Sequence, residues 1–238
     1  MVNIILGNKG GIAKSTISAL ISEYKIDQDK EVFCIDLDAE NTSFLKFKSL
    51  NVMTLQIKDK TTGDINKKKL DELFDIIFEN KNKEIIIDTG STLYTPLTTY
   101  FIENNFFQLL EDEGIKHNII SIVAGGGNFL DSLKGLQRIG ETFPKTDIIL
   151  INNQLLGSTI YNDIELINTK VVDALRDRIT GIVNISKKSD YITEDIVNMR
   201  QKSLLFSDLK TSDFGMMQRR RLIIYRDEIW AEFEKAGL

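Results

Sequence analysis

The stretch that decides the fold is GNKGGIAKST, Gly7–Thr16, which directly follows the short apolar run Val2–Leu6. Gly10 and Gly11 let the backbone curl so that successive N–H groups point inward. A helix expected from Lys14 onward adds the positive end of its dipole to the same concave turn. A strand, a glycine turn and a helix in this order favour a phosphate-binding loop over a plain glycine turn ahead of a surface helix.

Two residues distinguish this stretch from a generic phosphate-binding loop. Lys9 is an additional cation, and Ala13 stands where a glycine usually precedes the second lysine. That position often needs backbone angles that suit glycine better than a residue with a Cβ atom, so Ala13 is expected to strain or widen the loop. The predicted nucleotide contacts come from seven consecutive residues: Gly10, Gly11, Ile12, Ala13, Lys14, Ser15 and Thr16.

Within such a loop, each polar side chain has an expected task. Lys14 would reach the β- and γ-phosphates, and the Ser15 hydroxyl would bind Mg²⁺. Thr16 would hydrogen-bond a phosphate nearer the sugar. ATP and Mg²⁺ are therefore the predicted cofactors.

Composition predicts an ordinary globular chain of 238 residues, with 42% hydrophobic and 27% charged residues and only two prolines. No Pro- or Gly-rich linker divides it, so residues 1–238 are expected to form a single P-loop ATPase domain. The net charge of −5 argues against a surface that is basic throughout. No apolar run reaches the roughly 20 residues of a membrane span. A lone Cys34 and a strand-like N-terminus without a leader favour a cytoplasmic location.

Apolar strand-like runs alternate with helical patterns along the whole chain. Predicted strands are Val2–Leu6, Val32–Ile35, Val52–Ile57, Glu84–Ile87, Asn118–Ala124, Ile148–Ile151 and Ile179–Ile185. Predicted helices are Lys14–Tyr24, Lys69–Asn80, Pro96–Glu111, Phe129–Glu141, Ile167–Arg178, Thr193–Phe206 and Met217–Lys235. This alternation indicates an α/β fold, a mostly parallel sheet of about seven strands with helices on both faces. Ligands of such sheets bind at the carboxyl ends of the strands.

Three aspartates lie at predicted strand ends. Asp36 and Asp38 end the second strand two residues apart, and strand alternation places both on one side. Asp88 ends the isoleucine-rich run that begins at Glu84. An apolar strand that delivers one carboxylate in this way looks like a Walker B strand, and Mg²⁺ prefers such oxygen ligands together with waters.

The loop resembles the deviant Walker A motif of the ParA/MinD family of ATPases, with the pattern Lys9-Gly10-Gly11-x-x-Lys14-Ser15. The resemblance implies a homodimer that closes around ATP and Mg²⁺. In that dimer Lys9 would reach the phosphates bound by the partner subunit, and Lys14 would act within its own subunit. A second cation at the transferring phosphoryl group would stabilise its charge, and dimerisation would control when it arrives.

The same resemblance gives roles to four residues further along. Asp36 and Asp88 would lie with Ser15 at the metal, and Asp38 would orient the attacking water. Asn152, after the strand Ile148–Ile151, would contact the adenine edge, and Asn153 is the next candidate for this contact. Lys9, Lys14 and Asp38 are thus the expected catalytic residues. The chain departs from partition ATPases at residues 89–91, Thr-Gly-Ser, where those proteins usually have a pair of prolines.

A closer resemblance is to the TraL-type nucleotide-binding proteins of conjugative plasmids. Four segments carry it: Asp36–Phe44, Asp88–Ser91, Gly125–Gly127 with Asp131 beyond it, and Gln218–Leu222. It implies a molecular switch that hydrolyses ATP slowly and serves plasmid transfer or partition through another protein. Two alternatives remain: a nucleotide-gated binding module with little hydrolysis, and a kinase or ligase for a small molecule on the same scaffold.

Basic and amphipathic segments suggest two further kinds of partner, DNA and membrane. The basic runs 67–69 and 219–221 offer phosphate contacts to DNA, but a solvated helix face explains them better. The stretch Met216–Leu238 combines apolar and basic residues as an amphipathic membrane helix does. Four acidic residues nearly cancel its basic charge, so docking on the core or on a partner is expected instead of stable membrane insertion: Asp227, Glu228, Glu232 and Glu234.

Overall fold

The computed structural model describes residues 1–37, 42–58 and 65–238. Seven parallel strands form one sheet in the order β3-β2-β4-β1-β5-β6-β9. Their bounds are β1 Val2–Ile5, β2 Val32–Asp36, β3 Met53–Thr54, β4 Glu84–Asp88, β5 His117–Ala124, β6 Ile148–Asn153 and β9 Ile179–Ile185. The predicted α/β class and parallel sheet are confirmed.

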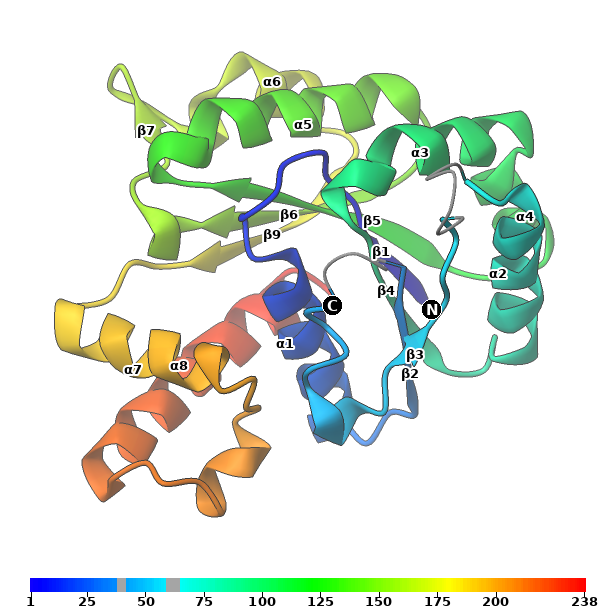
Figure 1. Cartoon of the computed structure of the whole chain (residues 1–238). Coiled ribbons are helices and arrows are strands. Elements are labelled where there is room, and N and C mark those ends of the chain that lie inside the picture. The colour runs from blue at the N-terminus through cyan, green and yellow to red at the C-terminus, as the bar shows by residue number, and fades with distance from the viewer. Residues whose placement is uncertain (38–41, 59–64) are drawn as a thin grey trace.

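Helices cover both faces of this sheet (Figure 1). One face carries α1 Lys14–Asp27, α7 Asp190–Gln201 and α8 Met216–Lys235. The other carries α2 Lys67–Glu79, α3 Tyr94–Glu103, α4 Phe106–Asp112, α5 Phe129–Thr142 and α6 Lys170–Ala174. Because β1 lies in the middle of the sheet, the loop that follows it opens at the centre of the carboxyl edge, where open α/β sheets bind ligands.

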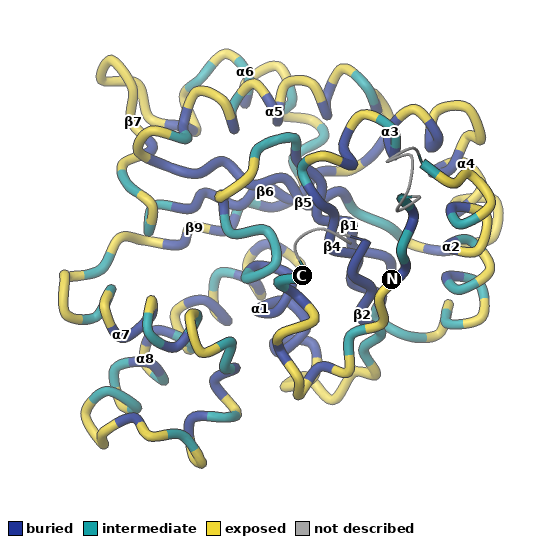
Figure 2. The backbone as a smooth tube through the Cα atoms, in the orientation of Figure 1, coloured by how far each residue is buried: buried dark blue, intermediate teal, exposed yellow. Residues whose placement is uncertain are grey.

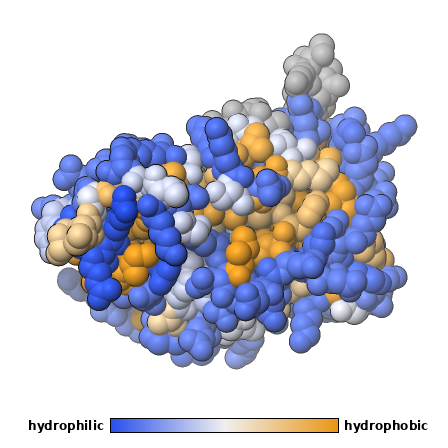
Figure 3. Space-filling view, turned by 90° about the horizontal axis from the view of Figure 1, so that it is seen from below, coloured by the Kyte–Doolittle hydropathy of each residue, from blue (hydrophilic) through white to orange (hydrophobic). Residues whose placement is uncertain are grey.

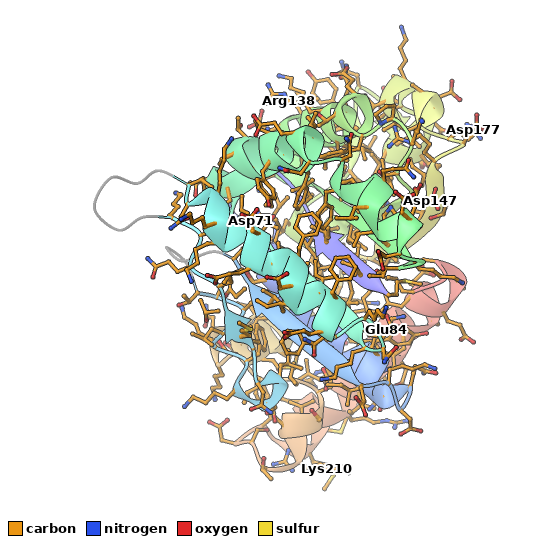
Figure 4. All side chains as sticks on the ribbon, turned by 90° about the vertical axis from the view of Figure 1, so that its right-hand side faces the viewer. Asp71, Glu84, Arg138, Asp147, Asp177 and Lys210 are labelled. Atoms are coloured by element: carbon orange, nitrogen blue, oxygen red, sulfur yellow. The ribbon has the colours of Figure 1, made fainter. Side chains whose placement is uncertain are left out.

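The strands are hydrophobic without alternation because both of their faces are covered. Ile85, Ile86 and Ile87 in β4 are fully buried, and they alternate between the two core clusters above and below the sheet. Figure 2 shows the central strands buried, with exposure mainly on the outer helices, the turns and the edge strands. At the amino end of β4, Glu84 lies 3.5 Å from the Nζ atom of Lys25, and Figure 4 shows its position. The carboxyl end of β4 carries Asp88.

One predicted helix, Pro96–Glu111, is in fact two. Helix α3 ends at Glu103, and α4 begins at Phe106 after Asn105, whose φ of 48° lies in the left-handed region. Asn104 accompanies the break by donating its Nδ2 hydrogen to the Tyr100 carbonyl. Asparagine tolerates left-handed backbone and competes locally for hydrogen bonds, which explains why a continuous apolar pattern is interrupted here.

Three other boundaries differ from expectation. The helix predicted over residues 167–178 is only the short α6, capped by the Thr169 hydroxyl, which accepts from the Val172 N–H. Helix α7 begins at Asp190 and ends at Gln201, before the left-handed Ser203. Of the strand predicted over 52–57, only the two residues of β3 pair with β2.

A small hairpin was not predicted. Strands β7 Ile160–Tyr161 and β8 Ile164–Glu165 pair antiparallel around Asn162 and Asp163, which both have positive φ angles of 47° and 61°. Two consecutive left-handed residues form the turn whose twist suits a two-residue hairpin. The Asn-Asp pair was the local signal for it, and the strands on either side are too short to show periodicity.

Helix α8 docks on the core, as expected. It buries Leu222, Tyr225, Ile229, Trp230 and Phe233, and Trp230 packs on Tyr24 of α1 with ring centroids 5.5 Å apart. Figure 3 shows this side of the molecule, where hydrophilic side chains surround the apolar patches. Among residues 1–37, 42–58 and 65–238, no helix has the length and hydrophobicity needed to cross a bilayer.

The glycines at 125–127 allow a close approach between two backbones. A Cβ atom on Gly125 would lie 1.8 Å from the Gly157 carbonyl oxygen. The Gly126 N–H donates to the Ser158 carbonyl at 2.9 Å. The close neighbour of this turn is therefore the segment after β6, which crosses over the end of β5.

Candidate functional site

The loop after β1 has the curled backbone of a phosphate cradle. Gly11 and Ala13 both have φ of 74°, so left-handed residues stand on either side of Ile12. The Lys14 Nζ donates to the Lys9 carbonyl at 2.8 Å, so its side chain lies across the concave side of the loop. The left-handed backbone angles of Ala13 are the strain expected at this position. An alternating left-handed turn of this kind aims backbone N–H groups at an anion.

Replacing Ala13 with glycine should stabilise the protein. A left-handed conformation costs an L-residue about 1–2 kcal/mol. Glycine avoids this cost, but its greater freedom in the unfolded chain reduces the gain in stability. We expect Ala13→Gly to raise the free energy of unfolding by about 0.5–1 kcal/mol, measured by chemical denaturation. Ile12→Gly is the control, because removing a buried side chain from the same loop should destabilise. An Ala13→Gly protein less stable than the parent would show that the loop is not strained at this residue.

Beneath the loop, two serines from the first turns of α1 bind one carboxylate. The Ser15 hydroxyl donates to Asp88 Oδ2 at 2.6 Å, and the Ser18 hydroxyl donates to Asp88 Oδ1 at 2.8 Å. Ser15 and Ser18 are three residues apart, so they share one face of the helix. The end of β4 and the start of α1 are thereby held together, with two of the predicted metal ligands in contact.

Asp36 lies beside Asp88, because these two residues are register partners in the neighbouring strands β2 and β4. Both carboxylates are buried, and Asp36 Oδ2 also accepts from the Leu45 N–H at 3.3 Å. Burial raises the pKa of Asp88 to about 7; the serine hydrogen bonds act against this rise, and the Asp36 carboxylate adds to it. Two adjacent carboxylates with a hydroxyl offer the hard oxygen donors that Mg²⁺ takes.

The raised pKa of Asp88 predicts a pH-dependent stability in EDTA. The folded protein holds a proton on Asp88 up to about pH 7, whereas the carboxyl in an unfolded chain loses it near its ordinary pKa of 3.8, so the free energy of unfolding falls as pH rises between these two values. In Asp88→Asn this pH dependence is absent, because the amide does not titrate. Relative to the parent protein, we expect the free energy of unfolding of Asp88→Asn to rise by about 2 kcal/mol between pH 5 and pH 8, measured by urea denaturation. Asp131→Asn, at an exposed carboxyl whose pKa is lowered, should show no such growth; an Asp88→Asn curve parallel to the parent would contradict the assignment.

Lys9 is bound within its own chain. Its Nζ donates to Asp131 Oδ2 on α5 at 2.9 Å, and this hydrogen bond holds the pKa of Asp131 below its usual range. The two side chains are 36% and 55% exposed, and such surface ion pairs break at little cost. Next to it, Asn8 packs so tightly on α5 that a Cβ on Gly135 would lie 2.7 Å from the Asn8 Oδ1. The loop thus rests on the first turns of α5.

The two asparagines that end β6 point to opposite sides. The Asn153 Nδ2 donates to the Ile12 carbonyl of the loop at 3.4 Å, whereas the Asn152 Nδ2 donates to Asn184 Oδ1 at 3.0 Å. Successive residues of a strand alternate in direction, so only one of the pair can face the loop. Asn153 therefore faces the phosphate loop, whereas Asn152, the expected adenine contact, lies beside Asn184 at the carboxyl ends of β6 and β9.

The remaining predicted residues are Asp38, Thr16 and Gly10. Asp38 lies outside the described residues. Thr16 is half-buried in the first turn of α1, and Gly10 faces Ser91, whose Oγ would lie 3.5 Å from an added Cβ. Within the described ranges, no cluster of three or more His, Cys, Asp or Glu side chains is arranged to hold a metal.

Most of the cations in the two basic runs are engaged within the chain. Lys67 pairs with Glu103 at 2.8 Å, and Lys69 pairs with Glu72. Arg221 pairs with Asp195 at 2.6 Å, and Arg219 donates to the Ser212 carbonyl. Neither run forms an isolated basic patch, so the structure adds no support for contact with DNA.

Sequence reasoning missed Ser18 and the contact that Asn153 makes with the loop. Ser18 follows Ser15 at helical spacing on the same face, and this spacing was the available signal. Which of Asn152 and Asn153 faces the loop depends on where β6 ends and on which side of the sheet each side chain lies. Two adjacent identical residues give no signal for either.

Comparison with known proteins gives relatives over the whole chain. No family model matches. Two curated Escherichia coli proteins, both named Protein TraL, are each 30% identical to this chain over 241 and 240 residues, which cover 100% of this chain and 98% of theirs. Among solved structures, a chain of the MinC:MinD cell division protein complex of Aquifex aeolicus matches with a TM-score of 0.52 at 16% identity, over 97% of this chain and 96% of that one.

Proposed function

This chain belongs to the TraL family and has the fold of ParA/MinD-type P-loop proteins, and on that basis we propose that it is a switch that binds and slowly hydrolyses ATP. Residues 1–238 would act as one ATPase domain in the cytoplasm. The observation that carries the proposal is the contact of Ser15 with Asp88 at 2.6 Å, directly below a loop with two left-handed residues. A phosphate cradle and a set of hard oxygen donors thereby meet at one point.

The described residues support a division of tasks around ATP. Lys14 and the backbone N–H groups of the loop would hold the phosphates. Ser15, with Asp36 and Asp88 behind it, would hold Mg²⁺, which supplies charge neutralisation at the phosphates when bound. Asp38 would orient the attacking water. Asn152, near the end of β6, would contact the nucleobase, and Asn153 beside it would hold the loop backbone at the Ile12 carbonyl.

Lys9 is the residue that would act across a homodimer. In the isolated chain this lysine pairs with Asp131, and exposure of both side chains leaves it able to turn outward. In an ATP-bound homodimer Lys9 would leave Asp131 and approach the phosphates of the partner subunit, where a cation stabilises the charge of the transferring phosphoryl group. ATP binding would thus be coupled to dimerisation, and a plasmid-transfer or partition protein would respond to the dimer.

Calorimetric titration of the full chain tests the proposal. We expect a non-hydrolysable ATP analogue with Mg²⁺ to bind with a Kd well below about 1 mM and to produce dimers in light scattering. In EDTA the affinity should fall, because the metal ligands would be left without their ion. No heat at millimolar nucleotide would overturn the ATPase proposal.

Two results would favour the alternative functions. Binding of ATP without turnover would favour the nucleotide-gated module. A phosphorylated or ligated small-molecule product, formed equally well by Lys9→Ala, would favour the kinase or ligase, because neither needs a lysine from a second subunit.

A further inference from the structure

A groove of about 240 Å³ lies between α4 and the segment that joins α5 to β6. Its floor is aromatic. Phe101 and Phe106 stack with ring centroids 4.1 Å apart, and Phe107 packs on Phe143 at 5.0 Å. All four rings line the groove and are buried. The floor is therefore a packed cluster that needs no partner to form.

The wall opposite α4 is held in place by hydrogen bonds. It consists of residues 142–146, and Arg178 donates from its Nη2 to the Thr146 carbonyl at 3.0 Å. Arg138 of α5 and Asp147 before β6 flank this wall, and Figure 4 labels both. A groove with a fixed wall and a packed floor loses little conformational freedom when it binds a partner.

The side of α4 that faces the groove is polar and acidic. Asn105, Gln108 and Glu111 line the groove at intervals of three residues, which places them along one side of the helix. The Gln108 Nε2 donates to Asp112 Oδ1 at 3.0 Å, so Asp112 lies beside this face. Glu113 follows directly, and three consecutive carboxylates thus stand at the carboxyl end of α4.

These carboxylates are not neutralised by the chain itself. Within the part of the chain that the structure describes, no Lys or Arg forms an ion pair with residues 111–113, and the nearest cationic candidate, His117 Nε2, lies 4.0 Å from Glu111 Oε1. They also stand at the negative end of the α4 dipole, where a cation is stabilising and a carboxylate is not. Lys145 is the one cation among the described residues that line the groove. Charge complementarity therefore favours a basic partner.

The size and rim of the groove favour part of a macromolecule over a free small ligand. Its volume is below the range of about 300–1,000 Å³ that small-molecule sites usually have. Ile102 lines the groove and is 54% exposed, so an apolar surface continues from the floor to the rim. The groove therefore suits one large apolar side chain of a bound protein, with cations beside it.

The groove and the proposed nucleotide site lie toward opposite edges of the sheet. Helix α4 leads into β5, and residues 142–146 lead into β6, so the groove is near the amino ends of these strands. The phosphate loop and Asn152 are at the carboxyl ends. Between them runs β6, Ile148–Asn153, with a length of about 16 Å at about 3.3 Å per residue. A nucleotide bound at the loop does not account for this groove.

We propose that this groove is a docking site for a partner protein that inserts a phenylalanine or leucine flanked by lysine or arginine. The apolar side chain packs on Phe107 and Phe143, and the flanking cations face residues 111–113. Cations in that place also stabilise the carboxyl end of α4. The proposal does not rest on ATP binding, and its test uses the chain without nucleotide.

Peptide binding to the full chain, followed by amide-resolved NMR, tests the proposal. The probe is acetyl-Lys-Lys-Phe-Lys-Lys-amide, and we expect saturable shifts at Ile102, Gln108 and Thr142 with a Kd of about 1 mM. Acetyl-Lys-Lys-Ala-Lys-Lys-amide keeps the charges without the ring and should give no saturable shifts there. Acetyl-Glu-Glu-Phe-Glu-Glu-amide keeps the ring with reversed charge and should bind about tenfold more weakly or worse.

Variants at exposed residues locate the bound peptide. A triple variant, Glu111→Gln with Asp112→Asn and Glu113→Gln, should weaken binding about fivefold, because several exposed ion pairs are lost. Ile102→Gln should weaken it about threefold to tenfold, because part of the apolar contact is lost. Ile224→Gln is the matched control, at a residue of α8 that is 46% exposed, and should leave the Kd unchanged.

Four results would each overturn the proposal. The first two are no saturation by the phenylalanine peptide up to about 10 mM, and equal affinity for the alanine peptide. The third is an unchanged Kd in the triple variant. The fourth is a set of shifts at Ile102 that grow with protein concentration in the absence of peptide, which would assign the groove to a second copy of this chain.

Discussion

Lys9→Ala is expected to lower ATP turnover by about 100-fold or more while leaving ATP bound to each subunit. The reason is that Lys14 and the loop N–H groups hold the nucleotide within one chain, whereas Lys9 would act only on the phosphates of the other subunit. Steady-state phosphate release and light scattering with ATP measure the two consequences. Both the turnover and the ATP-dependent dimer should be lost together, with little change in the calorimetric affinity of the monomer.

Asp131→Asn is the matched control, because it frees Lys9 from its partner on α5 without removing the lysine. This variant should keep its turnover and dimerise at the same or a lower ATP concentration than the parent protein. An ATPase activity of Lys9→Ala close to that of the parent would exclude a role for this lysine across a dimer. Loss of nucleotide binding in the monomer would instead place Lys9 in the cradle of its own subunit.

Gly125→Ala should cost about 3 kcal/mol or more of the free energy of unfolding, which corresponds to a fall in Tm of about 6–12 °C. The added Cβ would lie 1.8 Å from the Gly157 carbonyl oxygen and 2.8 Å from the Ser158 carbonyl carbon. Both contacts are backbone atoms that cannot rotate away. The φ of Gly125, −76°, suits alanine, so the effect comes from the close approach alone.

Gly127→Ala is the control for this prediction, because a Cβ there would meet nothing within 4 Å. It should change the Tm by no more than about 2 °C. Differential scanning calorimetry of the two variants in parallel measures the contrast. Equal melting temperatures would mean that the segment after β6 moves aside without cost, and that the turn at residues 125–127 has no tight neighbour.

The sheet and the centre of the candidate site were predictable from local signals. Each parallel strand is a short apolar run, and the glycine pair Gly10-Gly11 between the first run and Lys14 marks the loop. Since parallel strands deliver their carboxyl ends to one edge, the meeting of Ser15 and Asp88 followed from their order in the chain. Strain at Ala13 was predictable because that position of the loop usually belongs to glycine.

The features that were missed depend on single residues or on contacts distant in sequence. The break at Asn105 replaces one helix by two although the apolar pattern continues through it. The hairpin rests on the left-handed angles of Asn162 and Asp163 rather than on its strands. The pairing of Lys9 with Asp131 spans 122 positions, and no local pattern reports such a contact.

Asn152 and Asn153 share one peptide bond while facing two different sites. Asn153 holds the Ile12 carbonyl of the loop, and Asn152 lines a pocket of about 340 Å³ between the hairpin β7–β8 and the ends of β6 and β9. A ligand that shifts one of these side chains moves the backbone that positions the other. Thermodynamic linkage makes any such effect reciprocal: the factor by which a group in the pocket changes the affinity of the loop for phosphate equals the factor by which phosphate changes the affinity of the pocket for that group.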